Sequence, residues 1–301
     1  MKNKLGYCCI NTELSAKGIN TGRDVMKKNY TIEKASSLGL LNVLDLKKII
    51  EWNNLNGIRM YRITSELFPW DSEYEFQDLK CFYEVSEILM ECGNLARKDD
   101  QRLTMHPGHF SVIASLKSEV VTKAIKDLRH HAEIMDLMGL TRNSSYPINI
   151  HVNTAQPNKE DAAERFCRNF ELLPENVRCR LVLENDDKKS LFTASELYDL
   201  IHKRIGIPLT FDYFHYKCNP DEERNSREAL ELCLSTWPNG IRPITHYSDS
   251  KKTFEDNLAR TTAHSDWIWE KKVETYDLEF DIEFEVKRKQ EALIKYINDG
   301  K

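Results

Sequence analysis

The sequence predicts an α/β fold, a closed barrel of eight parallel strands with a helix after each strand. Short apolar runs alternate with longer amphipathic runs along the 301 residues, a rhythm typical of parallel strands joined by helical crossovers. About eight such cycles occur, which favours a single TIM-type (β/α)8 barrel over an open doubly wound sheet. Because one barrel of this kind fills about 250 residues or more, we expect a single domain over residues 1–301.

The strands are predicted where short apolar runs stop at a polar residue or a turn. Parallel strands are covered on both faces, so they read as nearly continuous apolar runs rather than as alternating ones. The runs that meet this description lie at 5–9, 58–63, 102–105, 148–150, 180–183, 208–211, 242–245 and 278–284.

The helices are predicted from apolar residues that recur on one helical face. Segment 76–94 places Leu79, Phe82 and Leu89 on such a face, and segment 120–138 does the same with Val121 and Leu128. Further helices are predicted at 45–54, 159–173, 194–204, 226–235 and 287–298, with Asp45, Asp161 and Ser226 in capping or first-turn positions. The long polar stretch 11–44 is expected to be a functional loop at the carboxyl end of the first strand.

Composition excludes several classes of protein. The net charge of -5 provides no overall positive field, so binding to nucleic acid must depend on a local surface. No apolar run reaches about 18 residues and no signal segment is present, so we expect no membrane contact and an intracellular protein without a targeting signal, whether in cytoplasm, nucleoid, nucleus or viral factory. The 8 cysteines form no C-x-x-C pair and are expected to be reduced thiols.

Six of the predicted strands end in a residue that can bind a metal ion. Because the carboxyl ends of all barrel strands meet at one rim, these side chains should share one space. Imidazole and carboxylate together suit Zn, Mn or Fe-type ions better than an oxygen-only Mg or Ca site. Any one of them could be structural, but six in register predict a centre of two or three metal ions. They are His106, His151, Glu184, Asp212, His246 and Glu285, and His215 and His264 extend the set.

Several segments, in this order and spacing, resemble the UV damage endonucleases. They are Leu5-Gly6-Tyr7 with Asn11, Tyr61-Arg62-Ile63-Thr64-Ser65 with Leu67-Phe68-Pro69, His106-Pro107-Gly108, Leu183-Glu184-Asn185-Asp186, Asp212-Tyr213-Phe214-His215 and Glu285-Val286-Lys287. The resemblance covers residues 5 to about 289. It implies a TIM barrel related in architecture to endonuclease IV. It also implies incision of DNA on the 5′ side of UV photoproducts (cyclobutane dimers, 6-4 photoproducts and, by extension, abasic sites), leaving 3′-hydroxyl and 5′-phosphate ends.

The resemblance also implies roles for particular residues. One metal ion would be held by His106, His151 and Glu184, and a second by Glu184, Asp212, His246 and Glu285, with the last four as the catalytic residues. His215 and His264 would belong to a third ion. Mn²⁺ is the first expectation, with Zn, Mg or Co as alternatives, and the partner is UV-damaged double-stranded DNA bound by a monomer. Residues implied to touch the lesion or the DNA are Tyr7, Asn11, His109, Phe110 and Lys287.

Two positions depart from the family pattern. His109 stands where the family usually has glutamine, which makes this position titratable. Ile244 stands where family members can carry a lysine that becomes a carboxylated metal ligand, which predicts weaker occupancy of the third metal site. For phosphate contact we consider Arg23, Lys27, Lys28, Lys34, Lys251 and Lys252 on the rim, and we assign Lys271 and Lys272 to a solvated surface.

Three other functions remain open from the sequence. The chain could be an abasic-site endonuclease with little preference for UV lesions. It could be a metal-dependent sugar isomerase, because such barrels also gather Glu, Asp and His at strand ends. It could also be a damage-binding protein that has lost catalysis, an alternative that Ile244 keeps open.

Overall fold

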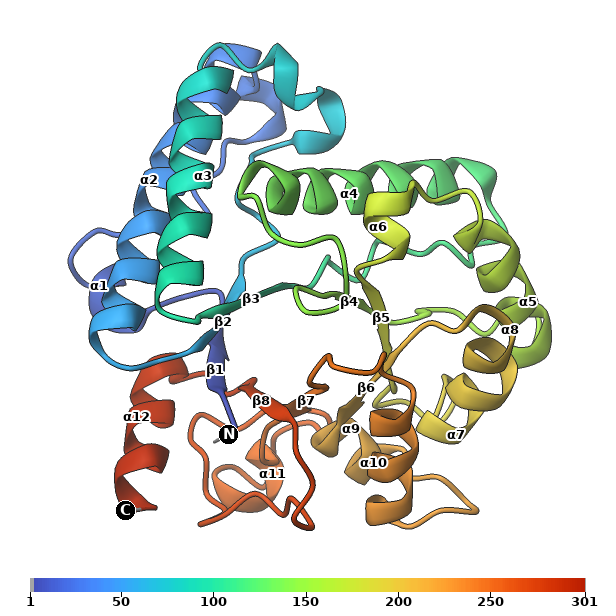
Figure 1. Cartoon of the computed structure of the whole chain (residues 1–301). Helices are drawn as coiled ribbons and strands as arrows, with labels where there is room; N and C mark the ends of the chain where they lie inside the picture. The colour runs from blue at the N-terminus through green and yellow to red at the C-terminus, as the bar shows by residue number, and fades with distance from the viewer. Residues whose placement is uncertain (1–2, 301) are drawn as a thin grey trace.

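The strands form a closed barrel in which each strand is parallel to the next (Figure 1). The computed structural model describes residues 3–300. The ring closes where the first strand pairs with the last, with Leu5 opposite Ile282. The strands are β1 Leu5–Cys8, β2 Met60–Ile63, β3 Arg102–Met105, β4 Ile148–Ile150, β5 Leu181–Glu184, β6 Leu209–Asp212, β7 Ile244–Tyr247 and β8 Asp281–Phe284. The predicted barrel is therefore confirmed, with each predicted strand within a few residues of its place.

The helices lie outside the ring of strands, and α2 and α3 extend beyond it as a pair (Figure 1). The α-helices are α1 Thr12–Ser15, α2 Ile32–Leu55, α3 Phe82–Lys98, α4 Ser118–Leu137, α5 Lys159–Phe170, α6 Glu175–Arg178, α7 Ala194–Leu197, α8 Lys203–Ile205, α9 Tyr213–Cys218, α10 Ser226–Ser235, α11 Lys251–Phe254 and α12 Lys289–Asp299. A π-helical turn at Tyr198–His202 joins α7 to α8, and 3-10 turns lie at Lys27–Asn29, Asp71–Glu73 and Phe76–Asp78. Within residues 3–300, no helix is both long and apolar enough to cross a membrane.

The prediction for the stretch after β1 was wrong in its second half. Residues 11–44 were expected to be a loop, but α2 begins at Ile32, where the Thr31 side chain caps it by accepting a hydrogen bond from the Lys34 backbone N–H. The buried face of α2 includes Ser36, Gly39 and Asn42, so its apolar periodicity is weak. At Gly39 a Cβ would lie 2.8 Å from the Phe68 ring, which explains a glycine inside this helix.

Smaller corrections concern helix ends. The predicted helix at 76–94 is a 3-10 turn followed by α3, which begins at Phe82. Asp45 does not cap a helix. It lies in the middle of α2, accepts a hydrogen bond from the Asn20 backbone N–H at 3.0 Å and pairs with Arg23. Asp161 and Ser226 do lie in first turns, after the capping residues Asn158 and Asn225.

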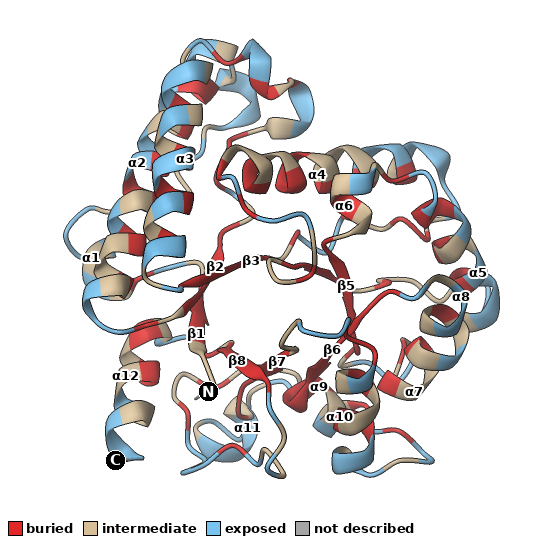
Figure 2. Ribbon diagram, viewed as in Figure 1, coloured by how far each residue is buried: buried red, intermediate tan, exposed pale blue. Residues whose placement is uncertain are grey.

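The barrel interior changes from one end to the other, and its strands are almost wholly buried (Figure 2). At the amino ends of the strands, Arg102 pairs with Asp281 at 2.9 Å. Beside this pair lies a small apolar cluster of Met60, Val182 and Ile244, joined by Trp237 from outside the strands, with Met60 opposite Arg102 and Ile244 opposite Asp281. Nearer the carboxyl ends the interior becomes polar, so the side chains that can bind metal sit on a packed floor rather than over a channel.

Candidate metal centre

The six residues predicted from the strand ends do meet at one rim. Glu184 and Asp212 are the last residues of β5 and β6, and His106, His151 and Glu285 directly follow β3, β4 and β8. His246 lies inside β7, opposite Glu283 of β8. Each side chain is placed by a short buried strand, so its position depends on the barrel and not on a flexible loop.

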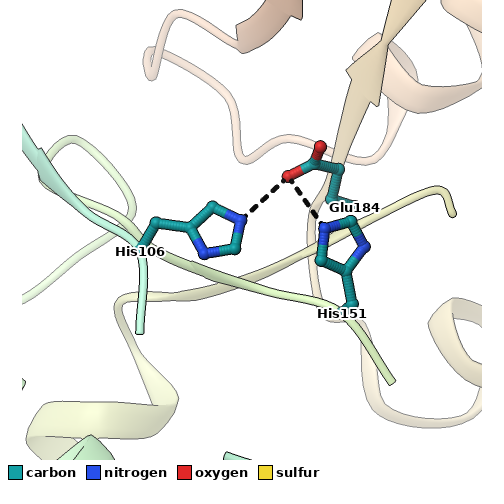
Figure 3. Close-up of side chains that lie close together, drawn as sticks. All are labelled: His106, His151 and Glu184. Atoms are coloured by element: carbon teal, nitrogen blue, oxygen red, sulfur yellow. Dashed lines mark hydrogen bonds and ion pairs between the residues drawn. The ribbon is translucent and has the colours of Figure 1, made fainter. Parts of the chain in front are cut away.

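The first group joins His106, His151 and Glu184. The Nε2 atom of His106 lies 3.3 Å from Glu184 Oε2, and the Nε2 atom of His151 lies 3.7 Å from the same oxygen (Figure 3). One ligand atom from each of the three residues falls within 4.8 Å of the others. Two imidazoles and a carboxylate at this separation could hold one divalent ion.

The second group joins Glu184, Asp212, His246 and Glu285, whose ligand atoms also lie within 4.8 Å of one another. The Nδ1 atom of His246 lies 2.9 Å from Glu184 Oε2 and 3.3 Å from Glu285 Oε1. Glu184 therefore belongs to both groups. A shared carboxylate between two ligand sets is the arrangement of a two-metal centre.

Burial and neighbouring charges shift the pKa values of these residues in opposite directions. Burial alone would raise the pKa of Glu184, but His246 and His151 hold it well below its usual range. Burial opposes protonation of His151, yet Glu184 and Asp186 raise its pKa to about 9. Burial dominates at Asp212 and raises its pKa. A cation that binds here must displace the proton of His151, since only neutral imidazole is a ligand.

The residues present fit a divalent ion. Asp212 Oδ2 is buried and accepts no hydrogen bond from the described residues, whereas Glu184 Oε1 faces His215 and Glu285 Oε1 faces Arg62. Buried carboxylate oxygens without a hydrogen bond are costly unless a cation neutralises them. Imidazole nitrogens beside them complete the mixed donor set that transition-metal ions prefer.

His215 and His264 lie beside this centre. The Nδ1 atom of His215 is 3.1 Å from Glu184 Oε1 and 2.9 Å from the backbone oxygen of Asn185. His264 pairs through Nδ1 with the Ser248 hydroxyl at 2.7 Å, and its ring lies 6.0 Å from that of His215. Among residues 3–300, neither histidine joins a group of three close ligand atoms. Ile244 is buried in the apolar cluster below and offers no donor toward them.

Three further polar residues support the centre and were not predicted as site residues. Asn149 donates a short hydrogen bond through Nδ2 to Glu184 Oε2, and Asp186 lies 3.3 Å from the Nδ1 atom of His151. Arg62 reaches Glu285 and His246 from β2. The signal in the sequence was a polar or charged residue within a buried strand, as in Tyr61-Arg62-Ile63 and Ile148-Asn149-Ile150.

The two residues in and after β1 that are expected to touch the lesion, Tyr7 and Asn11, are buried in this structure. Tyr7 is 0% exposed, and its hydroxyl donates to Asn53 Oδ1 at 2.8 Å. Asn11 is also buried, caps α1 and donates through Nδ2 to the Tyr7 hydroxyl at 3.0 Å. Both side chains are buried and hydrogen-bonded within the protein, and a role in contacting the lesion stays a prediction.

His109 and Phe110, by contrast, stand on the surface. Both follow β3 in the loop that begins at His106, and Phe110 is 78% exposed. Their rings are close together, with centroids 3.9 Å apart. Lys287 is exposed two residues after Glu285. These three residues are therefore accessible on the side of the barrel that carries the metal ligands.

Some of the basic residues considered for phosphate contact form ion pairs within the protein, and others are exposed. Arg23 pairs with Asp45 at 2.7 Å, and Lys251 pairs with Asp266 at 2.9 Å. Lys27 lies 3.3 Å from Glu73 and 5.3 Å from the centre of the Trp70 ring. Lys34 is in the first turn of α2 rather than in a loop. Lys28 and Lys252 are exposed.

Comparison with known proteins identifies the family. Residues 3–301 match the model of the family described as UV-endonuclease UvdE. The UV-damage endonuclease of Schizosaccharomyces pombe is 34% identical over 98% of this chain, which spans 50% of that relative's length. The crystal structure of SacUVDE is 30% identical and covers 99% of this chain and 97% of its own, with a TM-score of 0.86.

A more distant structure shares the architecture. Endonuclease IV from Thermus thermophilus is 15% identical, covers 85% of this chain and 92% of its own and has a TM-score of 0.59, so it shows the same fold. The family match extends over the six strand ends that carry the candidate metal ligands, and the structural match extends over the whole barrel. The chain therefore belongs to the UV-endonuclease UvdE family.

Proposed function

We propose that this protein is a metal-dependent endonuclease that nicks DNA on the 5′ side of UV photoproducts and leaves 3′-hydroxyl and 5′-phosphate ends. The main observation that supports the proposal is that two sets of potential ligand atoms share Glu184 at the rim of the barrel. The names of the relatives, UV-damage endonucleases, supply the class of substrate. A single barrel domain would provide the whole catalytic centre.

The two sets of residues would hold two divalent ions, with Mn²⁺ as the first expectation and Zn, Mg or Co as alternatives. Such ions supply the charge neutralisation and the activated water that phosphodiester hydrolysis requires. His106 and His151 would bind one ion and Asp212, His246 and Glu285 the other. Glu184 would bridge them, held in place by the Asn149 amide.

Damage recognition would depend on the exposed ring pair of His109 and Phe110. An aromatic ring on a loop next to the catalytic rim can stack where distorted bases have left the helix. Distortion at a lesion lowers the cost of turning nucleotides out of the stack. His109 can donate and accept hydrogen bonds, so it can contact the edges of bases beside the gap.

The test is an incision assay on three labelled duplexes, which carry a cyclobutane dimer, an abasic site or no lesion. Each is incubated with Mn²⁺ or with EDTA, and the product ends are compared with size standards and with ligation by DNA ligase. We expect a nick directly 5′ of the dimer in Mn²⁺ alone, with ends that support ligation.

Other outcomes would favour other functions. Preferential cutting of the abasic duplex would make the protein an abasic-site endonuclease. Binding to the dimer duplex without a nick would indicate a damage-binding protein that has lost catalysis. If the metal-loaded protein neither binds nor cuts any of the duplexes, the proposal is contradicted and the sugar isomerase alternative is favoured.

A further inference from the structure

We propose that Arg62 is a positioning residue of the second metal site, a fixed cation that holds Glu285 in the orientation needed to bind the ion. The proposal rests on the metal-dependent function proposed above. It assigns a task to a charged residue inside the barrel that the two ligand sets do not include.

Arg62 lies directly beneath the ligands. It is the third residue of β2, paired with Cys8 of β1 and Thr104 of β3, and it is 7% exposed. An arginine stays protonated under all conditions in which a protein is folded. A permanent charge in this position needs partners of opposite charge, since an unpaired buried ion is strongly destabilising.

Two carboxylates engage different nitrogens of the guanidinium. The Nε atom forms a short ion pair with Glu283, and the Nη2 atom lies 2.6 Å from Glu285 Oε1. The same Nη2 atom is 3.0 Å from the Nε2 atom of His246. Glu283 therefore holds the guanidinium at Nε, while Nη2 faces two residues of the second ligand set.

Glu283 serves as the anchor of Arg62. It is fully buried and accepts a hydrogen bond from the Thr104 hydroxyl at 2.6 Å, and the Cys8 thiol lies 3.5 Å from its other oxygen. Cys8, Glu283 and Glu285 also lie close enough together to hold a metal ion. The Arg62 guanidinium already contacts both carboxylates of that group and neutralises them. We therefore do not expect a metal ion there, and we assign metal binding to the two ligand sets that share Glu184.

The contact between Arg62 and Glu285 is expected to strengthen metal binding at the second site. Carboxylate ligands are usually held by hydrogen bonds from residues behind them, and loss of such a partner typically weakens metal binding about 10- to 100-fold. Without Arg62, Glu285 would keep its charge but lose the contact that fixes its rotamer. The first ligand set does not include Glu285 or His246, so it should be affected less.

The barrel contains a matched control. Arg102 is 6% exposed and pairs with Asp281 of β8, two residues before Glu283, at the amino ends of the strands. Replacement of Arg102 removes a buried ion pair between a neighbouring strand and the same β8, but far from the ligands. A purely structural role for Arg62 predicts equal effects of the two replacements.

The experiment titrates EDTA-treated wild type, Arg62→Met and Arg102→Met with Mn²⁺ in a calorimeter, without DNA. We expect two equivalents in wild type, one of them weakened about 10- to 100-fold in Arg62→Met, and both retained within about twofold in Arg102→Met. Arg62→Lys should show an intermediate loss, because one ammonium group cannot span Glu283 and Glu285. Arg62→Met with Glu283→Gln removes the unpaired carboxylate and provides a second folded variant for comparison.

The outcomes separate this proposal from the proposed function. Wild-type affinity in Arg62→Met, or equal loss in Arg102→Met, overturns the positioning role even if the wild type incises damaged DNA. If Arg62→Met and the double variant Arg62→Met with Glu283→Gln both fail to fold by circular dichroism while Arg102→Met folds, Arg62 is a structural residue and the proposal is abandoned. If the wild type binds no Mn²⁺, the proposed function fails together with this inference.

Discussion

At the scale of single residues, Glu184 has the central position. It is contacted by His106, His151, His215 and His246, and it belongs to both ligand sets. Glu184→Gln keeps the size but removes the charge that both ions need, so we expect incision to fall by roughly 10³-fold or more. The measurement is the single-turnover rate on a dimer duplex. Glu228→Gln is the control, because glutamine also serves in the capping box of α10, and equal loss in both variants would contradict the role of Glu184.

The pKa of His151 predicts how the EDTA-treated protein responds to pH. Burial opposes the charge, but Glu184 and Asp186 raise the pKa from 6.5 to about 9. A raised pKa stabilises the fold below pH 6.5, and this stabilisation is lost as the pH rises through about 9, an effect of about 3 kcal/mol at most. The pKa of Glu184 is held well below its usual range, by His246 first and then by His151, so this carboxylate stays charged throughout the same interval.

The corresponding measurement is the free energy of unfolding in EDTA between pH 6.5 and pH 9.5. We expect it to decline for wild type and to decline less for His151→Gln, where the raised pKa values of His215 and His246 still contribute. Saturating Mn²⁺ should reduce the decline, because the ion replaces the proton of His151. A wild-type decline no steeper than that of His151→Gln would show that His151 does not hold a proton beside Glu184.

The burial of Tyr7 predicts an effect on stability rather than on DNA binding. Tyr7→Phe removes the donor to Asn53 and the acceptor for Asn11, leaving two buried polar groups unpaired at a cost of about 1–3 kcal/mol in unfolding free energy. Tyr83→Phe, at a residue 83% exposed, should cost nothing measurable. Urea denaturation tests this, and a loss of dimer binding without a loss of stability would restore the lesion-contact role.

At the scale of elements, the exposed loop between β3 and α4 is proposed to contact damaged DNA without contributing to the stability of the fold. Phe110 is 78% exposed, so Phe110→Ala should leave the melting temperature unchanged while weakening dimer DNA binding by about 1–3 kcal/mol through lost stacking. Fluorescence anisotropy in EDTA measures binding without incision. Leu55→Ala removes an equally exposed apolar side chain from the end of α2. If it weakened binding as much as Phe110→Ala, stacking by this loop would be excluded as the cause.

The sequence predicted strands better than helices for a physical reason. A parallel strand buried on both faces is an apolar run that ends at a polar residue, and here those polar residues include the proposed metal ligands, such as Glu184 and Asp212. α2 was missed over its first half because its buried face contains Ser36, Gly39 and Asn42. The capping residue Thr31 was a local signal that could have marked its start.

The supporting residues were harder to predict than the ligands. The six strand-end residues were found because a barrel brings them together whatever their distance in sequence. Arg62, Asn149 and Glu283 point into the interior from within strands, and their partners become apparent once the register is known. Burial of Tyr7 depends on the packing of Asn53 from α2, a contact that no sequence pattern specifies.

At the scale of the whole molecule, an acidic protein is proposed to bind DNA. With a net charge of -5, attraction to phosphate must come from a local surface near the rim, and several of its basic residues already pair with carboxylates. Binding would then depend more on the exposed rings and the metal centre than on the overall field. The barrel provides both, because its strand ends place ligands and loops on the same face.

Two ions held around Glu184 are proposed to carry out incision. The most direct measurement is the rate of dimer-duplex incision as EDTA-treated protein, freed of the chelator, receives increasing equivalents of Mn²⁺. We predict negligible incision before Mn²⁺ is added and a rise that levels off at two equivalents per chain. Full incision in EDTA, or a plateau at one equivalent, would contradict the account.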